Sequence, residues 1–168
     1  MPSSQSPRMV LLTGDSGGIG QIMTAALLAA GHSVAAVDRD TAALARLAAQ
    51  HGGIKDRLHP IVADLATAAG CEGAVAEART RFGAIGAVIN NAGIGMSSVR
   101  PDAEARAPGI AELTPEIWDG FMAIFVRAPV MLLTMRPKPR RVMSGSVELL
   151  GPHRGHGFER PLWPRRRA

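Results

Sequence analysis

The chain has 168 residues and a mass of 17.6 kDa, which is typical of one domain of ~100–200 residues. Hydrophobic residues make up 46% and charged residues 20% of it, a composition that excludes an intrinsically disordered chain and predicts a packed core. The one cysteine, Cys71, excludes an intrachain disulfide framework and a zinc site built on paired cysteines. We therefore expect no metal site, and a reducing, cytoplasmic compartment.

The positive charge of the chain is concentrated near its C-terminal end. Residues 1–135 hold 10 basic and 12 acidic residues, a net charge of −2, whereas residues 136–168 hold 9 and 2, a net charge of +7. The basic segment contains five prolines but only Phe158 and Trp163 as aromatic residues, so it lacks the stacking residues of a surface that binds nucleic acid. We expect residues 151–168 to be a poorly ordered basic tail, and we do not expect nucleic acid as a partner.

The sequence predicts neither an export signal nor a membrane span. Residues 1–8 are polar and contain two prolines, so they lack the apolar core of a secretory signal. The most apolar stretch, residues 121–135, contains Arg127 and Pro129 and is shorter than the ~20 residues that a membrane helix requires.

Short apolar segments alternate with alanine-rich segments through the first 90 residues. We expect strands at 9–12, 33–37, 58–63 and 87–89, and helices from the first glycine turn to residue 30, from 40 to about 50, and from 67 to 82. Apolar strands separated by helices are typical of a parallel sheet covered on both faces. The sequence therefore predicts an α/β fold, a Rossmann-type doubly wound parallel sheet, in a domain of residues 1–150.

A polar loop follows residue 95 and leads to a further helix. Thr114, Pro115 and Glu116 supply an N-cap, a proline for the first helical position and an acidic first turn. We expect Pro129 to kink or shorten this helix, and we expect a fifth strand at 141–143.

A glycine-rich turn joins the first strand to the first helix. It has the sequence Thr13-Gly14-Asp15-Ser16-Gly17-Gly18-Ile19-Gly20, and its Gly-x3-Gly-x-Gly spacing differs from the common Gly-x-Gly-x-x-Gly fingerprint. A phosphate group needs several backbone N–H donors, and the first turn of a helix offers them at the positive end of its dipole. We expect Gly14 to make the tight turn, Gly18 and Gly20 to allow close approach, and the Thr13 and Ser16 hydroxyls to assist. Taken alone, the glycines favour an ordinary tight turn; the preceding strand, the following helix and Asp38 favour a nucleotide-binding turn instead.

Asp38 lies 20 residues after Gly18, at the end of the second expected strand. This is the place of a ribose-binding carboxylate, which would accept hydrogen bonds from the 2′ and 3′ hydroxyls of an adenosine. A 2′-phosphate at about 4 Å from Asp38 would cost a few kcal/mol, whereas the neighbouring Arg39 could bind that group. We therefore expect NAD as the cofactor, with NADP as the alternative.

Four motifs resemble the short-chain dehydrogenase/reductase family. They are Thr13-Gly14-x3-Gly18-Ile19-Gly20, Asp64-Leu65, Asn90-Asn91-Ala92-Gly93 and Thr114-Pro115-Glu116-x-Trp118-Asp119. The resemblance implies a sheet ordered 3-2-1-4-5 with a nicotinamide dinucleotide across the carboxyl ends of the strands. It also implies that Asp64 and Leu65 contact the adenine, that Asn90 helps to hold the central sheet, and that Ala92 and Gly93 lie against the cofactor. From the residues alone, Asn90-Asn91 could be a plain turn and Asp64 a helix cap.

The resemblance also implies hydride transfer between the cofactor and an alcohol or carbonyl substrate, with a tyrosine, a lysine, a serine and an asparagine as catalytic groups. Ser146 matches the serine. The sequence contains no tyrosine, and Glu159, Trp163 and Phe125 stand where the tyrosine, the lysine and the asparagine are expected. We expect a truncated family member, incomplete after the fifth strand, with impaired catalysis. The alternative is a non-catalytic nucleotide sensor or interaction module.

A sheet that is incomplete on its C-terminal side has consequences for solubility. The fifth strand would leave an open hydrogen-bonding edge, and the helices normally packed there would be missing. Apolar surface would then be exposed, so we expect self-association.

Overall fold

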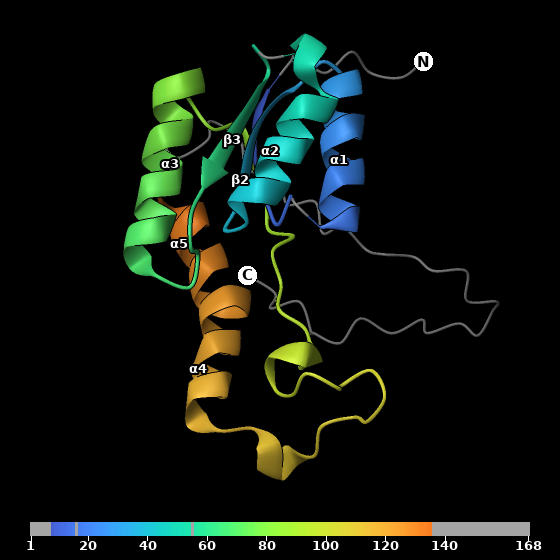
Figure 1. Ribbon diagram of the computed structural model, residues 1–168. Coiled ribbons are helices and arrows are strands. Elements are labelled where there is room, and N and C mark those ends of the chain that lie inside the picture. Colours follow the sequence, from blue (N-terminus) through green and yellow to red (C-terminus); the bar gives the residue numbers. More distant parts are fainter. Residues whose placement is uncertain (1–7, 16, 55, 136–168) are drawn as a thin grey trace, which may run out of the picture.

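Four parallel strands form one sheet in the order β3-β2-β1-β4 (Figure 1). The strands are β1 (Met9–Thr13), β2 (Ser33–Asp38), β3 (Leu58–Val62) and β4 (Ala87–Ile89). The computed structural model describes residues 8–15, 17–54 and 56–135, so the expected strand at 141–143, the tail, Ser16 and Ser146 lie outside the described residues. The strand order confirms the predicted parallel α/β sheet as far as its fourth strand.

The helices cover both faces of this sheet. They are α1 (Gly18–Ala29), α2 (Thr41–Gln50), α3 (Ala68–Phe82), α4 (Pro115–Met122) and α5 (Ala128–Thr134), with short 3₁₀ turns at Gly52–Ile54, Met96–Ser98 and Ile110–Glu112. Figure 1 shows α1 and α2 on one side of the strands, α3 and α5 on the other, and α4 extending beyond the sheet. This is the doubly wound arrangement that the sequence predicts.

Burial on both faces explains why the strand segments are apolar without alternation. Successive side chains of a strand point to opposite faces. Leu11 therefore packs in the cluster that contains α3 and α5 residues, while its neighbour Leu12 packs with residues of α1 and α2. In β2, Val37 belongs to the first cluster and Val34 to the second. Side chains of both parities are therefore buried, which explains why these strand segments are largely apolar.

Local capping sets the helix ends where the sequence predicts them. The Asp40 side chain accepts a hydrogen bond from the Ala43 N–H at 2.9 Å and begins α2. Thr114 accepts from the Ile117 N–H at 3.4 Å and begins α4. After α1, Gly31 adopts a φ of 86°, a conformation that favours glycine and ends the helix.

The helix after the polar loop continues through Pro129. A π-helical turn at Ala123–Arg127 joins α4 to α5, so Pro115–Thr134 is a continuous run of 20 residues. Pro129 lies in the first turn of α5, directly after the π turn, and the run does not end there. Of the two expected effects of Pro129, shortening does not occur; the helix is instead irregular directly before the proline, where the π turn accommodates the backbone bonding that proline disrupts.

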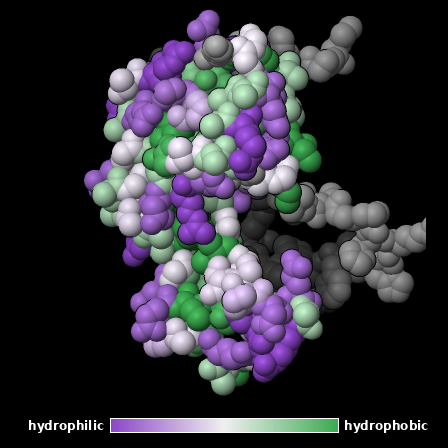
Figure 2. Space-filling view, in the orientation of Figure 1, coloured by the Kyte–Doolittle hydropathy of each residue, from purple (hydrophilic) through white to green (hydrophobic). Residues whose placement is uncertain are grey.

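This helical run also carries exposed apolar surface. Its length and its mean hydropathy of 1.5 are sufficient for a helix that crosses a membrane, but core helices of soluble proteins also meet these two criteria. In the structure, 17% of its most apolar 18-residue window is buried. Figure 2 shows hydrophobic residues among hydrophilic ones at the surface in the lower half of the view, where α4 lies. The exposed apolar side chains of the run are Trp118, Met122, Phe125, Val126, Val130 and Leu133. Apolar surface of this kind favours association with a partner.

Two glycines of α3 offer a matched test of how this helix packs. A Cβ at Gly70 would lie 2.0 Å from the Asp64 carbonyl oxygen, whereas a Cβ at Gly73 would meet nothing within 4 Å. We expect Gly73→Ala to raise the free energy of unfolding by about 0.5–1 kcal/mol, because alanine is the better helix former. We expect Gly70→Ala to lower it by more than about 1 kcal/mol, because the start of α3 must move away from the Asp64 turn. Urea denaturation measures both effects, and equal changes in the two variants would contradict this packing.

Candidate functional site

The glycine turn brings the end of β1 close to the start of α1 and to the segment after β4. Gly14 has a φ of 73°, and a Cβ there would lie 2.7 Å from the Ala92 Cα. A Cβ at Gly20 would lie 2.3 Å from the Gly14 carbonyl oxygen. Both positions therefore exclude a side chain, which confirms that Gly14 makes the tight turn and that Gly20 lets the helix pack closely.

The N-terminus of α1, by contrast, is open. Gly17 is its N-cap residue and supplies no side-chain cap, and a Cβ at Gly18 would meet nothing within 4 Å. A pocket of about 370 Å³ lies at this helix end, lined by Gly14, Gly17, Gly18, Ile19, Gly20, Asp38, Asn91 and Gly93. Backbone N–H groups at an open helix N-terminus are suited to bind an anion such as a phosphate.

A second pocket, of about 310 Å³, adjoins the first and shares Gly14, Asp38 and Gly93 with it. It is lined by Gly14, Val37, Asp38, Arg39, Ala63, Asp64, Leu65, Ala66, Ala92, Gly93, Ile94, Ser98, Gly120 and Ile124. The fold thus brings together, at the carboxyl ends of the strands, all the candidate cofactor residues in the described ranges except Thr13 and Asn90. This end of a parallel sheet is where ligands bind in such folds.

The two adjoining pockets are together called the crevice below. Thr13 and Asn91 connect the glycine turn to the segment after β4 by hydrogen bonds. The Thr13 hydroxyl accepts hydrogen bonds from the backbone N–H groups of Asn91 and Ala92, at 3.1 and 3.0 Å. The Asn91 side-chain amide donates to the carbonyl oxygens of Thr13 and Gly14, both at 3.1 Å. Thr13 is buried, so its hydroxyl positions the backbone from inside the fold.

Asn91 therefore has the role that the sequence interpretation gave to Asn90. Asn90 is exposed, and the side-chain amide that donates to the glycine turn in the described residues is that of Asn91. Two adjacent asparagines after a short strand differ only in the direction their side chains take. That direction depends on the path of the chain after Ile89, for which the sequence holds no separate signal.

The two carboxylates after β2 and β3 also have local structural partners. Asp38 accepts from the Asp40 N–H at 3.1 Å, and Asp64 accepts from the Ala66 N–H at 2.9 Å. The cap of α3 is Thr67, whose hydroxyl oxygen accepts from the Gly70 N–H at 3.0 Å. Asp64 is thus a turn residue that precedes the cap, and its side of the turn lines the second pocket.

A buried carboxyl group lies inside the glycine turn, and the sequence interpretation missed it. Asp15 has no exposed surface, and its Oδ1 accepts a hydrogen bond from the Thr24 hydroxyl at 3.1 Å. Its Oδ2 is buried without a hydrogen-bond partner in the described part of the chain. Burial raises the pKa of Asp15 from 3.8 to about 8; the Thr24 hydrogen bond opposes this rise, and the charge of Asp38 adds to it. The sequence held one signal for this buried group: a charged residue lies within a glycine turn that leads directly into a helix.

The side chain at the end of the crevice is a phenylalanine. Phe125, in the π turn, stacks on Phe121 with 5.9 Å between the ring centroids, and its Cε1 would lie 3.2 Å from a Cβ at Gly93. From the same turn, Arg127 donates to the Ala66 carbonyl oxygen and ties the helix to the Asp64 turn. Phe125 stands where the family resemblance places an asparagine, and a hydrocarbon ring cannot relay a proton.

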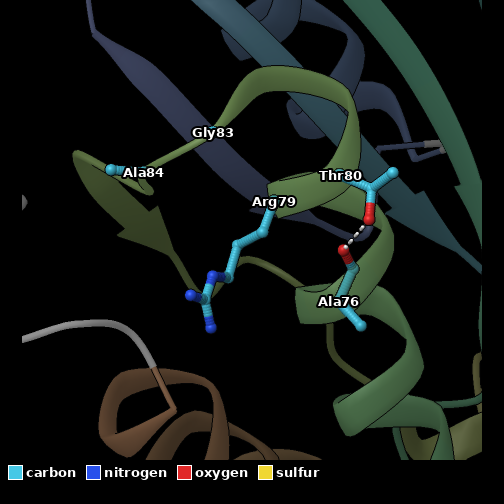
Figure 3. A pocket seen from close by; sticks show the side chains of 5 residues that line it. All are labelled: Ala76, Arg79, Thr80, Gly83 and Ala84. Atoms are coloured by element: carbon cyan, nitrogen blue, oxygen red, sulfur yellow. Dashed lines mark hydrogen bonds between the residues drawn. The ribbon is translucent and has the colours of Figure 1, made fainter.

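Another hollow, of about 490 Å³, lies at the opposite end of the sheet. It is lined by Ala76, Arg79, Thr80, Gly83 and Ala84, where α3 leads into β4. Figure 3 shows Arg79 extending away from the helix, while the Thr80 hydroxyl donates to the Ala76 carbonyl oxygen at 3.0 Å. Since this is the amino end of the strands and holds a single charged side chain, its chemistry is poorer than that of the crevice. Within the described ranges, no group of three or more His, Cys, Asp or Glu residues could hold a metal ion.

The Asp15 carboxyl gives a test of the turn that needs no ligand. Its pKa is higher in the folded state, near 8, than the ordinary 3.8, so between these values the unfolded state releases a proton that the folded state keeps. The free energy of unfolding therefore falls as pH rises from about 4 to 8. We expect the stability of Asp15→Asn relative to the parent to be greater at pH 8 than at about pH 4 by a few kcal/mol, since one pKa unit is about 1.4 kcal/mol.

Urea denaturation at several pH values between these limits measures this difference. The cost of placing an asparagine amide at position 15 is the same at every pH, so the pH dependence isolates the carboxyl. A stability difference between the two proteins that does not change with pH would show that Asp15 is not held protonated.

Comparison with known proteins adds evidence independent of the geometry. The family model described as short chain dehydrogenase matches residues 8–138. The D-threitol dehydrogenase of Mycolicibacterium smegmatis is 32% identical over 117 residues, which are 70% of this chain and 41% of that protein. The 2-(R)-hydroxypropyl-CoM dehydrogenase of Xanthobacter autotrophicus is 35% identical over 141 residues, which are 83% of this chain and 53% of that protein. The chain thus spans about half the length of these relatives.

Solved structures agree with this match. The 3-ketoacyl-(acyl-carrier-protein) reductase of Brucella melitensis, complexed with NADH, has a TM-score of 0.62 and 32% identity over 76% of this chain and 47% of that chain. The L-sorbose reductase of Gluconobacter frateurii, complexed with NADPH and L-sorbose, has a TM-score of 0.67 and 26% identity over 78% and 46% of the two chains.

Proposed function

This chain belongs to the short chain dehydrogenase family, and we propose that it binds a nicotinamide dinucleotide, NAD in preference to NADP, in the two adjoining pockets. The observation that carries the proposal is the open N-terminus of α1 beside a glycine turn in which Gly14 and Gly20 leave no room for a Cβ. The residues present fit such a ligand, because one pocket is lined both by the helix N-terminus, whose backbone donors suit a diphosphate, and by Asp38, whose carboxylate suits a ribose.

Each part of the dinucleotide has a counterpart among the residues of the crevice. The N–H groups at Gly18 and Ile19 would bind the diphosphate, and Asp38 would accept hydrogen bonds from the adenosine ribose. Asp64 and Leu65 would lie against the adenine, and Ala92 and Gly93 would border the remainder of the cofactor. When bound, the cofactor supplies the hydride of the family reaction.

The preference for NAD rests on the positions of the two charged side chains at the end of β2, Asp38 and Arg39. Asp38 lines both pockets, whereas Arg39 lines only one of them. A 2′-phosphate next to Asp38 would meet like charge. The relatives do not decide this point, because one solved relative is complexed with NADH and another with NADPH.

Titration of the 168-residue polypeptide with NADH tests the proposal. We expect NADH to bind more tightly than NADPH, and Gly18→Val to weaken NADH binding by at least about tenfold, or 1.4 kcal/mol, because the new side chain would block the helix N-terminus. Gly73→Val is the matched control, since a Cβ at either glycine meets nothing within 4 Å and each lies in a helix. Isothermal calorimetry measures both variants. Unchanged affinity in Gly18→Val would place the ligand elsewhere.

For the family reaction, we propose an alcohol or ketone as substrate and impaired turnover by these residues. The matching relatives are named for dehydrogenation of D-threitol and of a hydroxypropyl group, which supports an alcohol substrate class. The 168 residues contain no tyrosine, and Phe125 lies at the place of the relay asparagine. Ser146, the proposed catalytic serine, lies outside the described residues. A non-catalytic role for the bound dinucleotide is the alternative use of the same site.

We expect the polypeptide to bind NADH without oxidising it in the presence of a panel of ketones, and to bind NAD without reducing it in the presence of alcohols. The physical reason is that no phenol in these residues can deliver the proton that accompanies the hydride. The absorbance of NADH measures turnover, and a binding titration on the same sample serves as the control. Turnover above background would show that other side chains supply the proton.

Self-association and a cytoplasmic location also remain proposals, as does the division into a domain of residues 1–150 and a tail. The exposed apolar side chains of Pro115–Thr134 support association. Among the described strands, β4 pairs only with β1, and a strand edge without a partner would favour association.

A further inference from the structure

The carboxyl group of Asp15 lies within the loop that the proposed diphosphate would occupy. It is one of three residues between Gly14 and Gly18, and it has no exposed surface. A Cβ at Gly20 would lie 2.7 Å from the Asp15 Cα, so the start of α1 packs directly on this residue. The carboxyl therefore cannot turn out to solvent without moving the helix end.

The surroundings of Asp15 hold no compensating positive charge in the described part of the chain. From α1 the Thr24 hydroxyl donates to Oδ1, and Oδ2 has no partner. From β2, the negative charge of Asp38 raises the pKa of Asp15, and the backbone of Val37 has a smaller, opposite effect. The segments β1 and α1 contain no titratable side chain, and Asn91 and Ala92, which close the turn from the side of β4, are uncharged.

We propose that Asp15 makes dinucleotide binding by this turn proton-linked: the turn binds the diphosphate when the carboxyl is protonated and loses affinity when it ionises. This inference rests on the proposed function of the site. The diphosphate of a dinucleotide carries two negative charges, and an ionised carboxylate in the buried turn would add a third with no cation between them. In a medium of low dielectric constant, that repulsion is larger than it would be in water.

The proton balance follows from this repulsion. At a pH where the free protein has an ionised Asp15, binding of one dinucleotide takes up one proton from the solvent. At lower pH, where the carboxyl is already protonated, binding involves no proton from this group. Since burial raises the pKa of Asp15 to about 8, the affinity is constant below that pH and falls by about tenfold per pH unit above it.

Two variants change the titration in different ways. Asp15→Asn keeps the size of the side chain and removes the titrating group, so its affinity should not fall above pH 8. Thr24→Val removes the hydroxyl that stabilises the ionised form, so the fall should begin at a higher pH than in the parent. Asp56→Asn is the control for loss of one negative charge, because its carboxylate is fully exposed and lies near Arg81.

The experiment is a calorimetric titration of the full chain with NADH from about pH 6 to pH 10, in two buffers that differ in ionisation enthalpy. The dependence of the observed heat on the buffer gives the number of protons taken up. We expect uptake above about pH 8 in the parent and in Asp56→Asn, none from this group in Asp15→Asn, and a later onset in Thr24→Val. Circular dichroism checks that each variant is folded.

The outcomes separate this inference from the function on which it rests. Tight NADH binding with the same affinity at every pH, or an unchanged fall in affinity in Asp15→Asn, would overturn the role of Asp15 and leave the proposed function intact. Should Asp15→Asn not fold, an onset in Thr24→Val identical to that of the parent would overturn it instead. Absence of NADH binding at any pH would overturn both.

Discussion

Three backbone segments meet at the end of β1, and the crevice depends on their close approach. Gly14 leaves no room for a Cβ beside Ala92, Gly20 leaves none beside Gly14, and Thr13 and Asn91 exchange hydrogen bonds across the junction. Because these contacts join β1, α1 and the segment after β4, they determine where the N-terminus of α1 points. A larger residue at Gly14 or Gly20 would therefore separate the helix end from the carboxylates that follow β2 and β3.

The same close packing explains the unusual state of Asp15. Helix α1 can begin next to β1 only if the turn residues beneath it are small or buried, and here one of them carries a carboxyl group with one hydrogen bond from Thr24. Burial of that group reduces stability at neutral and alkaline pH, because the unfolded chain can release a proton that the folded chain retains. A strained or costly group at a ligand site is a common sign of function.

The π turn has a comparable double role on the other side of the crevice. It lets Pro115–Thr134 continue through Pro129, and it directs Phe125 toward Gly93 and Arg127 toward the Asp64 turn. Arg127 thereby ties the helix to the Asp64 turn, and Ile124 and Gly120 of the same helical run line the second pocket. Phe125 is also one of the exposed apolar side chains of this run, so residues that border the pocket and residues that could contact a partner share one helix.

The sequence by itself determined the parallel sheet, the caps at Asp40 and Thr114, and the glycine turn, because each rests on local rules: apolar runs, capping oxygens, and positions where only glycine fits. It did not show that Asn91 rather than Asn90 binds the turn, that Asp15 is buried, or that a π turn precedes Pro129. Those outcomes depend on side-chain direction and on which segments pack together. Only the tertiary structure decides them, because they are set by contacts between residues up to 78 positions apart in the chain.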